Sequence, residues 1–367
     1  MTTDTSSIAN SVASRSGLAQ IELYPPDLQP CSIDLSDNTN LWGAPPNAER
    51  VIREGAMRSP ARYPEPYSES LKDALSGYVG VDPSYIVVGC GSDDVLDSSI
   101  RAFGEPGERI ALPDPTFSML PFFARANGLE ISFVTLTADY DMDVERTLAL
   151  DAKITYICSP GNPTGTVIPR KTIEAIVAGT HGLVIIDEAY FEFCGETSTD
   201  LAAQSDRIVI VRTLSKAFGL AGLRVGYGIA SPSVVTEIEK SRGPFKVAGT
   251  SERAAVTAVT QDLPWIQARA REAVENKAKF VAALGTMGLS AIPSGSNFVL
   301  VPVRDAAGFA AALRGHDIAV KAFPRLPHAP GSTLAATQGD AVRITIGPWP
   351  VMERVIDAMR TVAAGRR

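Results

Sequence analysis

The sequence predicts an α/β fold with a large domain built on a mostly parallel sheet and a smaller α+β domain. Between about residues 47 and 250, short apolar runs alternate with helical patterns, which is typical of a parallel sheet covered on both faces. Beyond a long helical pattern the chain offers two further strands. The strands expected in the first region cover residues 86–89, 109–112, 131–134, 154–158, 183–187, 208–212 and 225–229.

The second region begins with a helical pattern from 251 to about 284 that is broken near Pro264. Strands at 297–303 and 342–346 follow, with helices near 305–313 and 351–364. We therefore expect three parts. Residues 1–46 would form an N-terminal arm and part of the small domain, 47–265 the large domain, and 266–367 the small C-terminal domain.

Composition excludes several classes of function. The chain has 367 residues, 45% of them hydrophobic, with a net charge of −7, so nothing in it resembles the basic surface that binds nucleic acid. Its four cysteines show neither metal-binding nor disulfide spacing, and its three histidines, expected in loops or at the surface, are too few for a metal cluster. No segment is apolar enough to span a membrane or act as a signal peptide, and we expect a cytoplasmic location.

Lys216 follows the apolar run 208–211 and has hydroxyl residues beside it, Thr213 and Ser215, with Arg224 eight residues later. A lysine amine bonds to an aldehyde only when it is unprotonated, which burial and neighbouring cations such as Arg224 favour. Hydroxyls and a guanidinium are suitable donors to phosphate oxygens. The pattern therefore indicates an aldehyde cofactor that carries a phosphate, namely pyridoxal 5'-phosphate.

Asp187 closes the expected strand 183–187 and is placed to pair with the protonated nitrogen of the cofactor ring. Asn162, in a turn rich in proline and glycine after the strand 154–158, and Tyr190 could both bond the ring's phenolic oxygen. Because ligands gather beyond the carboxyl ends of strands in open α/β sheets, these residues and Lys216 are expected to face one crevice.

A glycine-containing turn, Gly89-Cys90-Gly91-Ser92, precedes a helix that runs to about Phe103. We expect Ser92 to be the N-cap of this helix, whose free N–H groups would bind the phosphate. Phe117 follows the next strand, where its ring could stack on the cofactor; the alternative is a core aromatic.

Together these motifs resemble the fold-type I aminotransferases of class I/II, and within them the histidinol-phosphate aminotransferase-like group. The resemblance covers nearly the whole chain and implies an aspartate aminotransferase-like fold. The matching segments are 63–66, 91–93, 162–165, 187–190, 214–224, 296–298 and 342–347.

The resemblance also implies roles for individual residues. Lys216 would form the Schiff base and transfer protons, and Arg343 would hold the substrate carboxylate, with Asn38, Lys321 and Tyr24 also around the substrate. The phosphate would be surrounded by Ser92, Asp93, Thr213, Ser215 and Arg224. Tyr63 would reach the partner's cofactor phosphate, which implies a homodimer with shared active sites, acting on amino acids and 2-oxo acids.

Two departures from the family concern the substrate. The segment 37–43, which lies over the substrate in the family, has Thr39 and Leu41 where a glutamate and a proline are usual. Lys321 stands where members acting on histidinol phosphate usually carry an arginine, and lysine lacks the bidentate fork that suits phosphate. We therefore expect histidinol phosphate to be a poor substrate.

Two alternatives to transamination remain open in the sequence. If the carboxylate bond of the substrate, rather than Cα–H, is aligned with the cofactor's electrons, the same residues would decarboxylate it, as in the similar threonine-phosphate decarboxylases. A cofactor-binding domain without turnover, as in some transcription regulators, is the third reading. Retention of Lys216, Asp187 and Arg343 together favours turnover.

Overall fold

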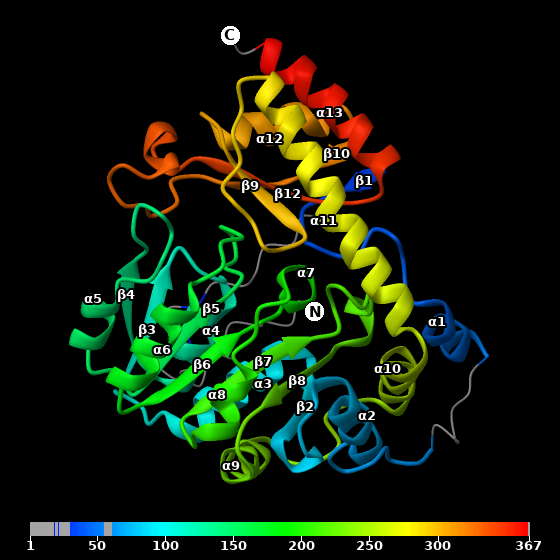
Figure 1. Cartoon of the computed structure of the whole chain (residues 1–367), viewed down its shortest axis with the longest axis vertical. Coiled ribbons are helices and arrows are strands. Elements are labelled where there is room, and N and C mark those ends of the chain that lie inside the picture. The colour runs from blue at the N-terminus through cyan, green and yellow to red at the C-terminus, as the bar shows by residue number, and fades with distance from the viewer. Residues whose placement is uncertain (1–17, 19–20, 22–29, 55–60, 366–367) are drawn as a thin grey trace, which may run out of the picture.

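The computed structural model describes residues 18, 21, 30–54 and 61–365, which form two sheet-based units (Figure 1). The large-sheet unit contains strands β2–β8, and the small-sheet unit contains β1 and β9–β12. In Figure 1 the small-sheet unit, yellow to red apart from the blue β1, lies above the large-sheet unit. The site described below is built from residues of both units.

Seven strands form the large sheet in the order β2-β8-β7-β6-β5-β3-β4. They are β2 (Ile86–Cys90), β3 (Arg109–Asp114), β4 (Glu130–Thr135), β5 (Ile154–Cys158), β6 (Leu183–Asp187), β7 (Ile208–Thr213) and β8 (Val225–Ile229). All pairings are parallel except those of β8, which runs antiparallel to β2 and β7. This confirms the mostly parallel sheet, and every strand lies within two residues of its predicted bounds.

Helices cover both faces of this sheet because side chains alternate along each strand. Ile185 packs on the face covered by α3 (Gly91–Phe103), α4 (Met119–Asn127) and α9 (Pro232–Arg242). Its neighbour Ile186 packs on the opposite face. That face is covered by α2 (Glu69–Val79), α6 (Arg170–Gly179), α8 (Thr199–Gln204) and α10 (Gly249–Gln261).

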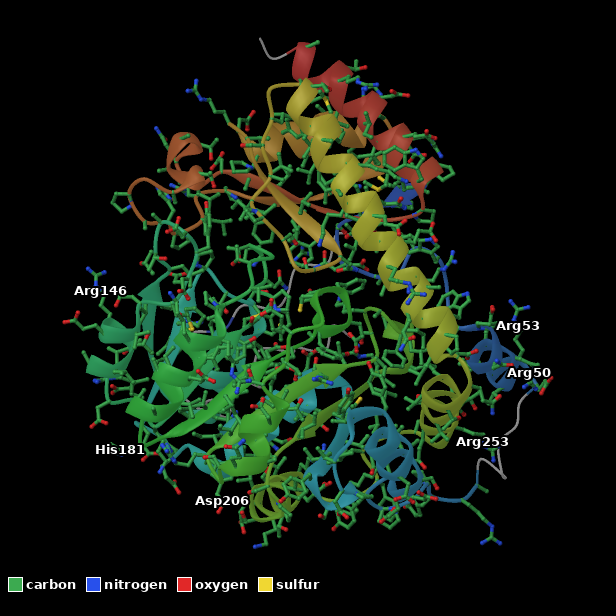
Figure 2. The ribbon with its side chains drawn as sticks, viewed as in Figure 1. Arg50, Arg53, Arg146, His181, Asp206 and Arg253 are labelled. Carbon is green, nitrogen blue, oxygen red and sulfur yellow. The ribbon has the colours of Figure 1, made fainter. Side chains whose placement is uncertain are left out.

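Shorter elements complete the large-sheet unit: α1 (Pro46–Arg53), α5 (Val144–Ala149), α7 (Phe191–Cys194), η2 (Pro83–Tyr85) and η3 (Ala221–Leu223). The charged side chains labelled in Figure 2, including Arg50 and Arg53 of α1 and Arg146 of α5, lie at the periphery of this unit. They take no part in the site.

The small sheet has the antiparallel order β11-β12-β9, and β1 pairs with β10 in parallel beside it. Its strands are β1 (Ile33–Asp34), β9 (Phe298–Pro302), β10 (Ile318–Ala319), β11 (Lys321–Phe323) and β12 (Ala341–Thr345). One face, with Val299 and Val342, packs with α11 (Leu263–Thr286), α12 (Ala306–Arg314) and α13 (Trp349–Ala364). The other face carries Leu300, which packs into the core of the large-sheet unit.

Two of the connections between the units lie away from the site. Helix α11 continues from the large-sheet unit into the small one (Figure 1), and Pro264 lies in its first turn, where proline needs no hydrogen-bonded N–H. In the second connection, Leu334 of η4 (Thr333–Thr337) is fully buried and its N–H donates to the Tyr140 hydroxyl at 3.1 Å. The expected domain boundary after residue 265 falls in the first turn of α11 and stays a prediction.

Candidate active site

Lys216 lies three residues beyond the end of β7, where it is half-buried. Its Nζ donates a hydrogen bond to the carbonyl oxygen of Asp37 at 2.9 Å. Burial and, after it, the nearby Arg343 cation lower the pKa of the amine to about 8. Arg224, the cation expected from the sequence, acts in the same direction after Arg343. The amine is thus made more readily available in its neutral, nucleophilic form.

Asp187 is the last residue of β6 and is 4% exposed. The Tyr156 hydroxyl donates to its Oδ2 at 2.7 Å, and the Ala189 N–H donates to its Oδ1 at 3.0 Å. Burial raises the pKa of the carboxyl and these two hydrogen bonds oppose the rise, with a net pKa of about 6. Asp187 is therefore ionised near neutral pH, as the partner of a protonated ring nitrogen must be.

Asn162 and Tyr190 both reach the opposite unit. The Asn162 Oδ1 accepts a hydrogen bond of 2.6 Å from Nη1 of Arg343, and the Tyr190 hydroxyl accepts one of 2.9 Å from Nδ2 of Asn38. Tyr190 is buried, which raises its pKa above the ordinary value and keeps it a neutral phenol. The two predicted ring-binding residues are thus each bonded to a predicted substrate-binding residue, Asn162 to Arg343 and Tyr190 to Asn38.

The expected phosphate ligands converge at the start of α3. Nη2 of Arg224 lies 3.3 Å from Oδ2 of Asp93, and Nη1 lies 3.5 Å from Oγ of Ser215. The Thr213 hydroxyl donates to Ser215 Oγ at 2.9 Å. These donors and the first N–H groups of the helix form a set suited to an anion.

The prediction that Ser92 is the N-cap of this helix is wrong. The helix begins at Gly91, so the N-cap position falls on Cys90 and Ser92 lies in the first turn. The sequence did not show that Gly91 would adopt a φ of 80°, a conformation that favours glycine, or that a Cβ there would lie 2.6 Å from Nη2 of Arg224. Ser92 nonetheless stays beside the phosphate ligands, with its backbone N–H in the first turn.

These residues fit pyridoxal 5'-phosphate. A lysine with a lowered pKa, a buried carboxylate and a group of phosphate donors lie at one edge of the sheet, and Gly91 leaves open the space that a Cβ would fill beside Arg224. The site residues are shared between two units, so the cofactor would be held at their junction.

Arg343 lies on β12, where its guanidinium contacts the Ser36 carbonyl at 2.5 Å and lies 5.3 and 5.5 Å from the rings of Phe298 and Phe323. Lys321 is its direct partner on β11. Opposed residues of an antiparallel pair point to the same face. The two predicted substrate-binding cations therefore share the face of the small sheet that looks toward the large-sheet unit.

Asn38 is 1% exposed and has a φ of 62°. Its N–H donates to the Thr345 hydroxyl at 3.1 Å, and its carbonyl accepts from the Asn297 amide at 3.1 Å. With its side-chain bond to Tyr190, Asn38 ties the segment that carries it to both units. The sequence assigned no site role to Thr345, Asn297 or Tyr156, although the first two lie in segments that match the family, because only folding brings them next to the predicted residues.

Three predicted residues are not joined to this group. Tyr63 is 84% exposed, with its ring 4.9 Å from that of Phe245, and its role in a partner's site stays a prediction. Phe117 is half-buried against the core of α3 and α4, so both stacking on the cofactor and core packing stay open. Tyr24 lies outside the described residues.

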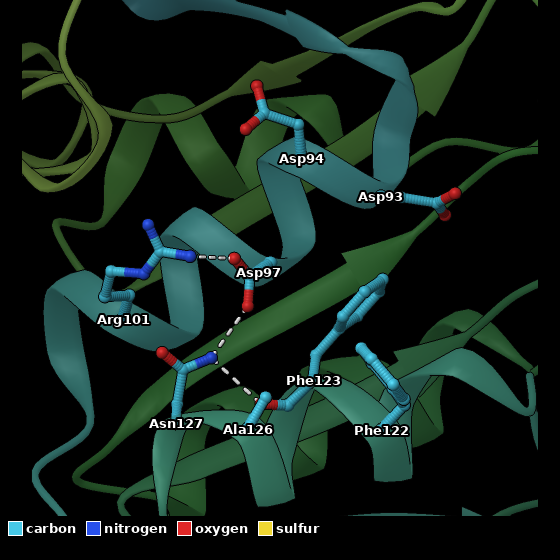
Figure 3. A pocket seen from close by; sticks show the side chains of 8 residues that line it. All are labelled: Asp93, Asp94, Asp97, Arg101, Phe122, Phe123, Ala126 and Asn127. Atoms are coloured by element: carbon cyan, nitrogen blue, oxygen red, sulfur yellow. Dashed lines mark hydrogen bonds and ion pairs between the residues drawn. The ribbon is translucent and has the colours of Figure 1, made fainter. Parts of the chain in front are cut away.

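A separate cavity of about 420 Å³ lies beside α3 and α4 (Figure 3). Its acidic residues are paired: Asp97 with Arg101 and Asn127, and Asp94 with Arg242 outside the lining. In Figure 3 the Asp93 side chain points away from these carboxylates. Of the residues that line this cavity, Asp93 alone was predicted to lie at the cofactor phosphate.

Other classes of site find no support in the described residues. They contain no group of histidine, cysteine and acidic residues that could hold a metal ion, and no helix long and apolar enough to cross a membrane. The three histidines lie outside helices and strands, as predicted, and His181 is visible at the edge of the molecule in Figure 2.

Comparison with known proteins places the chain in a family. Residues 31–359 match the family described as aminotransferase class I and II. The chain is 33% identical to a histidinol-phosphate aminotransferase of Thermoanaerobacter sp. (strain X514) over 86% of its own length and 87% of the relative's. It is 31% identical to one of Citrifermentans bemidjiense over 97% and 100%.

Among solved structures, the histidinol-phosphate aminotransferase of Sinorhizobium meliloti in complex with pyridoxal-5'-phosphate has a TM-score of 0.85. It is 23% identical, and the match covers 98% of this chain and all of that one. This likeness confirms the aspartate aminotransferase-like fold. The chain belongs to the class I and II aminotransferases and is a pyridoxal-phosphate-dependent enzyme of that family.

Proposed function

We propose that this aminotransferase moves an amino group between an amino acid, or an amino-alcohol phosphate, and a 2-oxo acid. The observation that carries the proposal is the opposition of Arg343 and Lys321 on the face of the small sheet beside Asn162. Two adjacent cations suit a substrate with a carboxylate or a phosphate. The names of the relatives favour amines of the histidinol-phosphate type as the first to be tried.

In this proposal the chain's own residues orient the substrate and move its proton. Arg343 binds the anionic group and fixes the direction of the bonds at Cα, and Lys216 accepts the Cα proton on Nζ when its amine is neutral. Asp187 stays ionised and holds the proton on the ring nitrogen. When bound, pyridoxal phosphate supplies the electron sink for the bond that breaks.

A half-reaction panel tests the substrate. The purified enzyme is mixed with histidinol phosphate and with aromatic, aliphatic and basic amino acids, and formation of the pyridoxamine form is followed by absorbance. We expect histidinol phosphate to have a lower kcat/KM than the best amino acid, because Lys321 offers a point charge in place of a bidentate fork. Release of CO₂ without the pyridoxamine form would instead show a decarboxylase.

The Lys321→Arg variant sharpens this test. It should raise kcat/KM for histidinol phosphate by about tenfold, the value of one well-placed charged hydrogen bond, and leave unphosphorylated amino acids nearly unchanged. Lys171→Arg, at an exposed lysine of α6, is the matched control. If histidinol phosphate leads the panel in the unmodified enzyme, Lys321 is sufficient for phosphate and the expected preference is wrong.

We also propose a homodimer in which each Tyr63 reaches the partner's cofactor phosphate, and a cytoplasmic location. The exposed rings of Tyr63 and Phe245 support a surface that a second copy would cover. Sedimentation at working concentration should give a dimer, and Tyr63→Ala should weaken cofactor binding. A fully active monomer would contradict the shared site.

A further inference from the structure

Tyr156 is a fully buried residue of β5 that points at the expected partner of the cofactor ring. In the parallel pairing of β5 with β6 it is opposite Ile185, and Cys158 is opposite Asp187. Tyr156 therefore shares a face of the sheet with Asp187, one alternate position back along the strands. The length of the phenol spans that offset, and the hydroxyl donates to Oδ2 of Asp187 at 2.7 Å.

We propose that Tyr156 is a positioning residue for the cofactor, acting through Asp187. Its hydroxyl fixes the carboxylate and keeps it ionised, so that Asp187 can hold the proton on the ring nitrogen. Oδ1 is fixed separately by the N–H of Ala189 at 3.0 Å. A carboxylate with one donor on each oxygen has a defined orientation and still has lone pairs for a third donor.

The surroundings of Asp187 make this hydrogen bond necessary. The titratable groups that act on it or on which it acts are Tyr156 and Cys158 of β5, Asp93 of α3, and Glu188 and Tyr190 that follow β6. Burial and the two acids among them favour the protonated carboxyl, and none of the five is a cation. The neutral donors are therefore what opposes protonation.

Tyr156 is suited to this task across the working pH range. Burial, followed by the charge of Asp187, raises the pKa of its phenol well above the ordinary value. The hydroxyl thus keeps its proton and donates a hydrogen bond to the carboxylate wherever Asp187 is ionised. An isosteric phenylalanine would keep the packing and remove only this donor.

The test measures binding of pyridoxal phosphate to the apoprotein as a function of pH for the unmodified chain and Tyr156→Phe. Losing a hydrogen bond to a charged group raises the carboxyl pKa by about one unit, a tenfold change in its ionisation. At pH 6 about half of the Asp187 carboxyls are ionised in the unmodified protein and roughly a tenth in the variant. Affinity should then fall about fivefold at pH 6 and be nearly unchanged at pH 8.5.

The ratio of the affinity of the unmodified chain to that of Tyr156→Phe reports the ionisation of Asp187 alone. Titration of Lys216 and of the cofactor phosphate affects both proteins equally and cancels in this ratio. Tyr227→Phe is the matched control: Tyr227 is equally buried, lies on β8 and packs on the opposite face of the sheet. It should show no pH-dependent ratio. A loss of affinity in Tyr156→Phe that is the same at every pH would overturn the proposal, and so would no loss at all.

A second measurement does not require the variant to bind cofactor. Carbonyl NMR of apoprotein labelled with ¹³C-aspartate, with Asp187→Asn to assign the signal, should show the Asp187 carboxyl titrating about one unit higher in Tyr156→Phe. If Tyr156→Phe does not fold, Tyr156 labelled as 3-fluorotyrosine in the otherwise unmodified chain should shift its ¹⁹F signal as Asp187 titrates. A signal that does not follow the carboxyl would refute the coupling.

Discussion

The buried ion pair between Arg212 and Glu188 gives the sharpest stability prediction. The side chains are 4% and 2% exposed, and the Arg212 guanidinium donates from Nη2 at 2.8 Å and from Nε at 3.0 Å to the same carboxylate oxygen. Nη2 also contacts the hydroxyls of Thr197 and Thr199 at 2.6 and 3.1 Å. In Arg212→Met, Glu188 would be left as a buried acid without its counter-ion.

Removing one partner of a buried pair costs about 3–5 kcal/mol, because the remaining charge is desolvated and uncompensated. The loss of stacking on Phe191, whose ring lies 3.7 Å from the guanidinium carbon, acts in the same direction. We therefore expect Arg212→Met to lower the free energy of unfolding by about 4 kcal/mol. Urea unfolding of the apoprotein, followed by circular dichroism and by fluorescence, measures this loss where the two signals agree.

The ion pair between Arg170 and Asp200 is an exposed counterpart, so comparing the two pairs separates the effect of burial on stability from that of geometry. Their guanidinium and carboxylate also meet at two points, at 2.7 and 2.6 Å, but the side chains are 36% and 54% exposed. Water screens this pair, so Arg170→Met should cost no more than about 1 kcal/mol. Equal losses in the two variants would show that geometry rather than burial sets the energy, and would refute the reasoning.

Four further outcomes are expected at the active site. Lys216→Ala should abolish the reducible bond to the cofactor and turnover, as measured by borohydride trapping; a mutant that still forms that bond at the normal rate would show another lysine in the role. In the unmodified apoprotein, the rate of cofactor capture should rise with pH around a midpoint near 8, because the amine of Lys216 attacks only when neutral; a rate independent of pH between 6 and 9 would contradict its lowered pKa. Asp187→Ala should keep some bound cofactor but slow proton abstraction by orders of magnitude in single-turnover experiments, and an unchanged rate would exclude its role as the ring partner. Gly91→Ala should weaken cofactor binding at least tenfold by equilibrium dialysis, since the added Cβ would lie 2.6 Å from Nη2 of Arg224 at a φ of 80°; unimpaired binding would place the phosphate elsewhere.

Local patterns predicted most of the elements. The runs that became β5, β6 and β8 have the bounds expected from sequence. Each consists of five successive buried residues, so its two ends are clearly marked. The start of α3 was misplaced at Ser92 because serine is a better N-cap than cysteine or glycine by composition alone. The close approach of Arg224 to Gly91 joins residues 133 positions apart, so a local pattern could not show it.

The site was predictable to the extent that its residues follow strands. Asp187 and Lys216 stand at strand ends in the sequence, and parallel strands bring such ends together. Tyr156 carried no signal, because a tyrosine in the middle of an apolar run is typical of core. The opposition of Lys321 and Arg343 depends on the register of two short strands joined by a connection of 17 residues, from 324 to 340, which the sequence pattern does not fix.

The pairing of β1 with β10 constrains the order in which the molecule can be completed. Ile33 is hydrogen-bonded into a sheet with a strand that begins 285 residues later, whereas β2–β8 are contiguous between residues 86 and 229. On the ribosome the large sheet can form while the small one still lacks its C-terminal strands. The carbonyl of Asp37 can therefore meet Lys216 as in the finished molecule only late in synthesis, after β10 has emerged. Catalytic competence thus depends on β10 and on Arg343 of β12, and a nascent chain that ends before β10 could form the lysine-bearing sheet but not seat the segment that covers it.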